Sequence, residues 1–141
     1  AGSGPDMPGL QKLARNLKVS DSIQWAGKLK PEEINSFLHS GGIYVSPSRF
    51  ETFGLSIAEA MATGMPAAVT NSGGPQDFVA PFNGISCKKE DPAQLSLAIL
   101  NLIKSYDTFH PETIREFILR EFSGIAISKK NMSLYLSSSS K

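Results

Sequence analysis

The chain has 141 residues, a length that suits one domain with a sizeable buried core. Fourteen basic residues stand against thirteen acidic ones, and this near balance argues against a nucleic-acid-binding protein, which usually gathers a basic surplus on one face. The single cysteine, Cys87, excludes a disulfide within the chain and a zinc site built from several cysteines, and we expect no bound metal. No apolar run approaches the ~20 residues of a membrane span and no signal-peptide pattern is present, so we expect a cytoplasmic location.

Helical periodicity and cap signals alternate along the chain with short apolar runs that are typical of strands. The predicted helices cover residues 8–17, 31–40, 54–63, 92–103, 111–122 and 124–135. The predicted strands cover residues 22–27, 43–45, 67–70 and 84–87. We predict one domain over residues 1–136, with no linker inside it, and a frayed tail at 137–141.

Strands that alternate with helices predict an α/β fold, with a Rossmann-like parallel sheet and helices on both faces. Ligands of such sheets bind beyond the carboxyl ends of the strands. Three loops leave predicted strands at that edge, at residues 27–30, 46–54 and 71–74. These loops are where we expect the chemistry.

The segment from Ser46 to Gly64 carries the strongest signals. The N–H groups of Phe53, Gly54 and Leu55 are predicted to be unpaired at a helix start, where they would favour an anion, and Gly54 would let a phosphate approach the backbone. Glu59 lies five residues further, roughly 7.5 Å along the axis at ~1.5 Å per residue.

Two carboxylates flank this predicted anion site. Carboxylates do not bind anions, but they accept hydrogen bonds from sugar hydroxyls. We therefore predict that Glu59 meets a ribose whose phosphate rests on the helix start. Glu51, on the loop before the helix, would face the other side of the phosphate, where a transferred sugar would sit.

Glu51 and Glu59, with seven residues between them and Phe53-Gly54-Leu55 inside, resemble the paired-glutamate signature of retaining GT-B glycosyltransferases of the group 1, or family 4, type. The pair Gly73-Gly74 with Asp77 fits the same family, although its members commonly carry Glu at that acid. The resemblance extends from Gly2 to about Tyr135. It implies a C-terminal nucleotide-sugar-binding domain that is incomplete at its N-terminus.

The resemblance implies roles for individual residues. Glu51 would be the catalytic-site residue that contacts the donor sugar, and Glu59 would bind the donor ribose. The remaining donor contacts implied are Phe53, Gly54 and Leu55 at the diphosphate and sugar, Gly73 and Gly74 beside the donor, and Gly27, Lys28 and Leu29 at the nucleobase. The family transfers a hexosyl group from a nucleoside-diphosphate sugar, such as a UDP- or GDP-sugar, to a sugar, lipid or polysaccharide acceptor, with retention and without a metal.

By the same resemblance, a basic pair that holds the diphosphate would precede Ala1, and the acceptor would bind mainly to an N-terminal domain absent from this sequence. The chain alone is then expected to be inactive. The alternative function is a module that binds a nucleotide or nucleotide sugar without turnover. A third interpretation is an interaction role, in which an exposed sheet edge pairs two copies into a homodimer.

Several residues have simpler interpretations that stay open at this point. Gly73 and Gly74 are equally well explained as an ordinary turn. Arg49 would touch phosphate or form a surface ion pair, and Cys87 is expected to be an inert thiol although Lys88 and Lys89 follow it. The pair Lys129-Lys130 is typical of a solvated face, with a weak membrane-surface contact as its alternative.

Overall fold

The computed structural model describes residues 1–138, which divide into two compact units, 1–37 and the part from Leu38 onward. The single domain predicted over residues 1–136 stays a prediction, and we describe the two units separately. The first unit holds α1 (Met7–Asn16), a 3-10 turn at Ser20–Ser22 and most of α2 (Pro31–His39). Proline and acids at the start of α2 and His39 in its last turn suit the helix dipole.

The strand predicted at residues 22–27 is wrong. Ser20–Ser22 form the 3-10 turn, and residues 23–27 belong to no strand. One backbone hydrogen bond, from the N–H of Gly2 to the carbonyl of Gly27 at 2.6 Å, joins this segment to the opening residues. A strand requires a ladder of such bonds with a neighbour, which the local apolar pattern cannot supply by itself.

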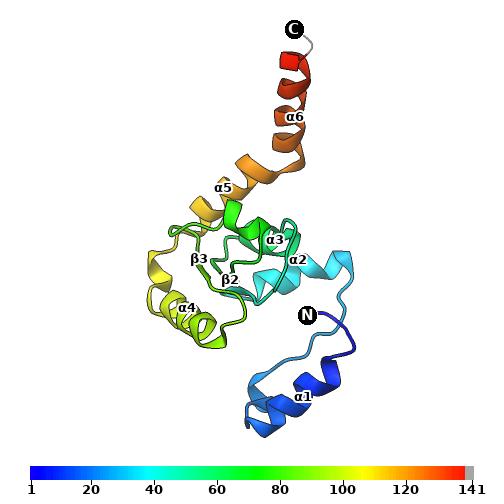
Figure 1. The fold of residues 1–141 in the computed structure, drawn as a ribbon, viewed down its shortest axis with the longest axis vertical. Helices are drawn as coiled ribbons and strands as arrows, with labels where there is room; N and C mark the ends of the chain where they lie inside the picture. Colours follow the sequence, from blue (N-terminus) through cyan, green and yellow to red (C-terminus); the bar gives the residue numbers. More distant parts are fainter. Residues whose placement is uncertain (139–141) are drawn as a thin grey trace. The chain divides into compact units, whose positions relative to one another are not determined.

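The second unit contains a three-stranded parallel sheet (Figure 1). Its strands, in the order in which they lie side by side, are β1 (Tyr44–Ser46), β2 (Ala67–Thr70) and β3 (Gly84–Cys87). The ladders run from Tyr44↔Ala67 to Ser46↔Val69 and from Ala67↔Gly84 to Thr70↔Cys87. The predicted parallel sheet is therefore confirmed, and all four residues of β2 are buried at its centre.

Helices cover both faces of this sheet, as predicted. The helices of the second unit are α3 (Leu55–Met61), α4 (Pro92–Lys104), α5 (Pro111–Phe122) and α6 (Gly124–Ser138), with 3-10 turns at Gly74–Asp77 and Tyr106–Thr108. Figure 1 shows β2 and β3 between α3 and α4. Alternate residues of β2 serve the two faces, because successive side chains of a strand point to opposite sides.

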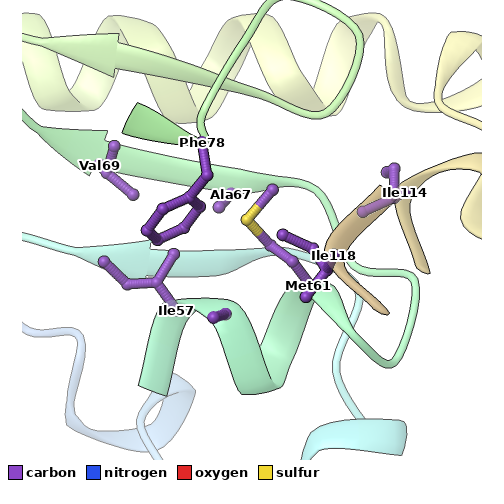
Figure 2. Packing of buried hydrophobic residues seen from close by; sticks show 8 residues of the cluster. Ile57, Met61, Ala67, Val69, Phe78, Ile114 and Ile118 are labelled. Atoms are coloured by element: carbon purple, nitrogen blue, oxygen red, sulfur yellow. The ribbon is translucent and has the colours of Figure 1, made fainter. Parts of the chain in front are cut away.

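Two apolar clusters fill the two faces. Ala67 and Val69 pack with Ile57 and Met61 of α3, and with Phe78, Ile114 and Ile118 (Figure 2). On the other face, Ala68 and Cys87 pack with Ala98 and Leu102 of α4. Small residues on β2 let both helices approach the sheet closely.

The ends of the helices follow the signals in the sequence. The side chain of Asp91 accepts a hydrogen bond from the Gln94 N–H at 3.1 Å and caps α4, and His110 with Pro111 begins α5. Of the predicted frayed tail, residues 137 and 138 belong to α6, and residues 139–141 lie outside the described residues. None of the helices described is both long and apolar enough to span a membrane.

Candidate functional site

Glu51 lies on the loop that follows β1, and its backbone is fixed against the loop that follows β2. Its N–H donates to the carbonyl of Ser72 at 2.9 Å, and its own carbonyl accepts from the N–H of Gly74 at 3.0 Å. These bonds make a parallel bridge between Glu51 and Gly73 beyond the ends of the strands. The half-buried Glu51 is therefore held at the carboxyl edge of the sheet, where the sequence places it.

Gly73 and Gly74 are required for this crossing of two loops. A Cβ on Gly74 would lie 2.4 Å from both the Cα of Phe53 and the carbonyl oxygen of Thr52. A Cβ on Gly73 would lie 2.6 Å from the carbonyl oxygen of Glu51, and the φ of Gly73 is 121°. The backbone on the other side cannot rotate away as a side chain would. These two glycines therefore allow the close approach of backbones that positions the Glu51 loop.

Gly54 ends this loop and caps α3. Its φ of 92° is left-handed, and a Cβ there would lie 3.0 Å from Ile57 Cδ1 and 3.1 Å from Pro75 Cγ. Within residues 1–138, the backbone N–H groups of Phe53, Gly54 and Leu55 donate to no backbone carbonyl, as predicted. The helix is shorter than predicted, with seven residues, so its dipole adds little to what these N–H groups offer an anion.

The side chain of Phe53 anchors this loop by packing against two other aromatic rings. Its ring centroid lies 5.4 Å from that of Phe78 and 5.7 Å from that of Phe122, distances typical of packed aromatic pairs. Leu55, by contrast, is 65% exposed. The packed ring of Phe53 thus fixes one part of the loop, while the side chain of Leu55 is exposed to solvent.

Glu59 is exposed on α3, while its neighbours Ala58 and Ala60 are buried. It lines a cavity of about 150 Å³ between α3 and α5. The other lining residues are Phe53, Leu55, Ala58, Ala62, Ile118, Leu119, Phe122 and Ser123. The cavity joins Glu59 to Phe53 and Leu55 of the loop that carries Glu51, and Glu51 itself is not among the lining residues.

Gly27, Lys28 and Leu29 belong to the first unit. Gly27 has a φ of 65°, and a Cβ there would meet no heavy atom within 4 Å. It lines a cavity of about 440 Å³ within that unit, bounded by residues of the ranges 1–10 and 23–27. The other predicted site residues belong to the second unit, and these three are described within the first unit only.

Sequence reasoning missed the hydroxyl groups beneath the Glu51 loop. Thr70, 3% exposed, donates from Oγ1 to the carbonyl of Ser48, and Ser46 Oγ lies 3.2 Å from Ser48 Oγ. The signal was a threonine ending an otherwise apolar buried strand. Such a hydroxyl must find a partner inside the protein.

Other polar candidates have structural partners. Arg49 Nε lies 3.3 Å from Glu90 Oε1 in an exposed ion pair, which is the surface-pair alternative. Lys130 is not merely solvated: its Nζ lies 3.0 Å from Glu121 Oε2 and 5.8 Å from the centroid of the Phe122 ring. Arg120 and Lys130, which bond to the Glu121 carboxylate, lower its pKa.

Cys87 shows no sign of activation. Burial, with Asp91 nearby, raises the pKa of its thiol, so Lys88 and Lys89 do not lower that pKa. Raising a thiol pKa makes the nucleophilic thiolate scarcer at neutral pH. No group of three or more potential metal ligands occurs among His, Cys, Asp and Glu in residues 1–138.

Fold and site together define an α/β, Rossmann-like domain whose polar residues gather at the carboxyl edge of a parallel sheet. The model of the family described as glycosyl transferases group 1 matches residues 1–118. The chain therefore belongs to this family, and the predicted Rossmann-like part of a GT-B fold is confirmed.

Individual relatives agree with the family model. D-inositol 3-phosphate glycosyltransferase of Corynebacterium urealyticum is 34% identical over 109 residues, covering 76% of this chain and 26% of the relative. Glycogen synthase of Mycobacterium tuberculosis is 34% identical over 104 residues, covering 73% of this chain and 25% of the relative. This chain thus spans about a quarter of the length of these two relatives.

Solved structures show the same fold. Sucrose-phosphate synthase from Thermosynechococcus elongatus superposes with a TM-score of 0.84 at 25% identity, over 97% of this chain and 37% of the other. HepE of Anabaena, in complex with UDP, superposes with a TM-score of 0.82 at 20% identity, over 94% and 36%.

Proposed function

We propose that this chain is the donor-binding part of a retaining glycosyltransferase, which transfers a hexosyl group from a nucleoside-diphosphate sugar to a sugar, lipid or polysaccharide acceptor. The observation that carries the proposal is the fixed backbone of Glu51 inside the segment that matches the family model. HepE, which shares the fold, was solved with UDP and with UDP and glucose, and this supports a nucleotide sugar as the ligand class.

The proposed roles follow the chemistry of the side chains. An ionised carboxylate accepts hydrogen bonds and a sugar hydroxyl donates them, so Glu51 would contact the transferred sugar and Glu59 the ribose. The N–H groups of Phe53, Gly54 and Leu55 would hold the diphosphate. Backbone groups of Gly27, Lys28 and Leu29 would meet the nucleobase.

Gly73 and Gly74 would line the donor cleft, and their crossing with residues 51–53 would keep Glu51 in place while ligands exchange. A preorganised group pays no reorganisation cost when the transferred sugar develops charge, which is how fixed polar groups speed reactions. We also propose that the reaction retains the configuration of the sugar and needs no metal. Both of these proposals rest on the family resemblance, and turnover that persists in excess chelator would support metal independence.

The proposal is tested first by an NMR titration of the chain with UDP, GDP, ADP and the corresponding sugars. Shifts centred on residues 53–59 and 27–29, with one base preferred, are the expected result. Shifts elsewhere, on a surface away from both segments, would contradict the site. Binding with the expected shifts, but no sugar transfer by a longer chain that includes the acceptor-binding part, would favour the alternative of a binding module.

The two glutamates are separated by a pair of variants in a form of the enzyme that includes the acceptor-binding part. Glu51→Gln should lower turnover more than it lowers nucleotide affinity, because Glu51 would contact the sugar. Glu59→Ala should weaken nucleotide binding itself. Equal affinity of wild type and Glu59→Ala for the nucleotide would overturn the ribose assignment, and we expect this chain alone to show no transfer.

Further parts of the prediction concern assembly and location. Within the described residues β1 pairs only with β2, and Val45 on it is 39% exposed, which supports a homodimer through this open edge. Sedimentation of a clean monomer at high concentration would contradict a dimer. A cytoplasmic location and a weak membrane contact through Lys129 and Lys130 stay predictions, for fractionation and vesicle binding to test.

A further inference from the structure

The pairing between the β1 and β2 segments changes register just before Glu51. The last rung of the ladder joins Ser46 to Val69, and the next pairing beyond it joins Glu51 to Gly73. The chain takes five steps from Ser46 to Glu51 but only four from Val69 to Gly73. Four residues, 47–50, lie between the two pairings on the β1 side and three, 70–72, on the β2 side, so the β1 side carries one extra residue. Residues 47–50 are called the bulge below.

This difference in length decides which residue reaches the bridge. The two segments are not extended strands, since one bends at Arg49 and the other at Asn71. Without the extra residue, the residue at the bridge would be Phe50, which is 78% exposed here. The bulge is therefore what brings the backbone of Glu51 into the crossing with Gly73.

Thr70 lies beside this bulge and bonds to it. It is the last residue of β2, its backbone pairs with Cys87 of β3, and its side chain is 3% exposed. The Oγ1 atom donates to the carbonyl of Ser48, which lies inside the bulge, and lies 3.4 Å from the carbonyl of Ser46. A side-chain hydroxyl thus replaces the backbone donor that the interrupted ladder cannot supply.

Residues 70, 72 and 74 each form a hydrogen bond with the loop that carries Ser48 and Glu51. The hydroxyl of Thr70 binds the carbonyl of Ser48, the carbonyl of Ser72 accepts from the N–H of Glu51 at 2.9 Å, and the N–H of Gly74 donates to Glu51 at 3.0 Å. The first of these three is the only one made by a side chain, so it is the one that substitution can remove without touching the backbone.

We propose that Thr70 is a positioning residue: its hydroxyl stabilises the bulge between β1 and Glu51 and so fixes where the backbone of Glu51 meets Gly73. The consequence for a ligand rests on the proposed function, in which Glu51 contacts the transferred sugar. The bulge itself does not depend on that function, and its test is separate.

The first test uses hydrogen exchange in the ligand-free chain with two substitutions. Thr70→Val keeps the shape and removes the donor, and Thr70→Ser keeps the donor. Loss of one buried hydrogen bond should speed exchange of the Glu51 and Gly74 N–H groups by roughly tenfold in Thr70→Val. Exchange of the Gln94 N–H, bonded to Asp91 at the start of α4, should not change, and Thr70→Ser should behave as wild type.

Two outcomes of this test would overturn the proposal. In one, the Glu51 and Gly74 groups exchange at the wild-type rate in Thr70→Val. In the other, exchange speeds up equally at Gln94, which would mean a general loss of stability. If Thr70→Val does not fold, the wild-type chain still decides: the hydroxyl proton of Thr70 should exchange slowly enough to give an NMR signal, and its absence in a complete assignment would contradict the bond.

The second test links the bulge to the ligand. Thr70→Val should weaken binding of a nucleotide sugar such as UDP-glucose by roughly tenfold, the size of one lost hydrogen bond, and leave binding of UDP unchanged. Equal loss for both ligands would contradict a role through Glu51. If wild type binds neither ligand, the proposed function fails for this chain, while the exchange result still decides the role of Thr70.

Discussion

Two glycine-bearing segments were predicted to contact the same ligand, and they differ in what holds them. Gly73 and Gly74 lie under the Glu51 loop, where a Cβ would come within 2.6 Å and 2.4 Å of backbone atoms. Gly27 lies in open space, where a Cβ would touch nothing within 4 Å, and one hydrogen bond from Gly2 reaches its carbonyl. A glycine that follows an apolar run can therefore be required for either of two reasons. Two backbones approach closely there, or an exposed turn needs a left-handed φ.

Gly74→Ala is the substitution from which we expect the largest effect. The added methyl would overlap the Cα of Phe53, so we expect a loss of about 3 kcal/mol in the free energy of unfolding. Chemical denaturation monitored by circular dichroism measures it. Gly9→Ala, inside α1 with open space around it, is the matched control and should be neutral or stabilising. A Gly74→Ala chain as stable as wild type would show that the loops are not in contact.

Gly27→Ala tests the glycine that lies in an exposed turn. The alanine has room, and only the φ of 65° opposes it, so we expect a smaller loss of about 1.5 kcal/mol. Because the effect is local, exchange of the Gly2 N–H should report it better than global unfolding. Full retention of Gly2 protection in this variant would argue that the left-handed φ is not maintained in solution.

The loop after β3 extends the comparison to a segment fixed by a side chain. Asp91→Ala removes the cap from the Gln94 N–H and should cost about 1 kcal/mol. Asp91→Asn is the control, because asparagine also caps helices and should recover most of the stability. The same denaturation measurement applies, and equal losses in the two variants would point to the charge of Asp91 and away from its hydrogen bond.

The smallest effect is expected at the link between the loops after β1 and β3. Arg49 and Glu90 are 83% and 59% exposed, so breaking their ion pair with Arg49→Ala should cost about 0.5 kcal/mol or less. A double-mutant cycle with Glu90→Ala measures the coupling, which should shrink further in high salt. A coupling above that of the Asp91 cap would mean that this pair, and not the glycine crossing, orders the loops.

Most elements could be predicted from local pattern. Helical periodicity with Asp91-Pro92 and His110-Pro111 predicted α4 and α5, and the short apolar runs predicted β2 and β3. The failure at residues 22–27 has a different origin, since Ile23 to Gly27 has a strand-like composition but no neighbour among residues 1–138 that completes a ladder. Strand formation depends on a partner, and composition reports only half of that requirement.

The site was predicted less completely. The spacing of Glu51 and Glu59 around Gly54 predicted a shared ligand site, which stays a prediction, and Gly54 does cap α3. Thr70 was missed because its importance comes from Ser48, a residue 22 positions away. For Arg49 the sequence left open a phosphate contact or a surface ion pair, but it did not indicate the partner, Glu90, which comes from another loop.

Local patterns in the sequence were enough to predict the alternation of strands and helices, the ends of α4 and α5, and the family to which the chain belongs. These are local features: periodicity, caps and a short motif act between residues a few positions apart. Only the tertiary structure decided that Gly73 and Gly74 lie against the Glu51 loop, that the ladder slips by one residue before Glu51, and that Thr70 bonds across the slip. The physical reason is that such contacts join distant segments, whose approach depends on how the whole sheet packs.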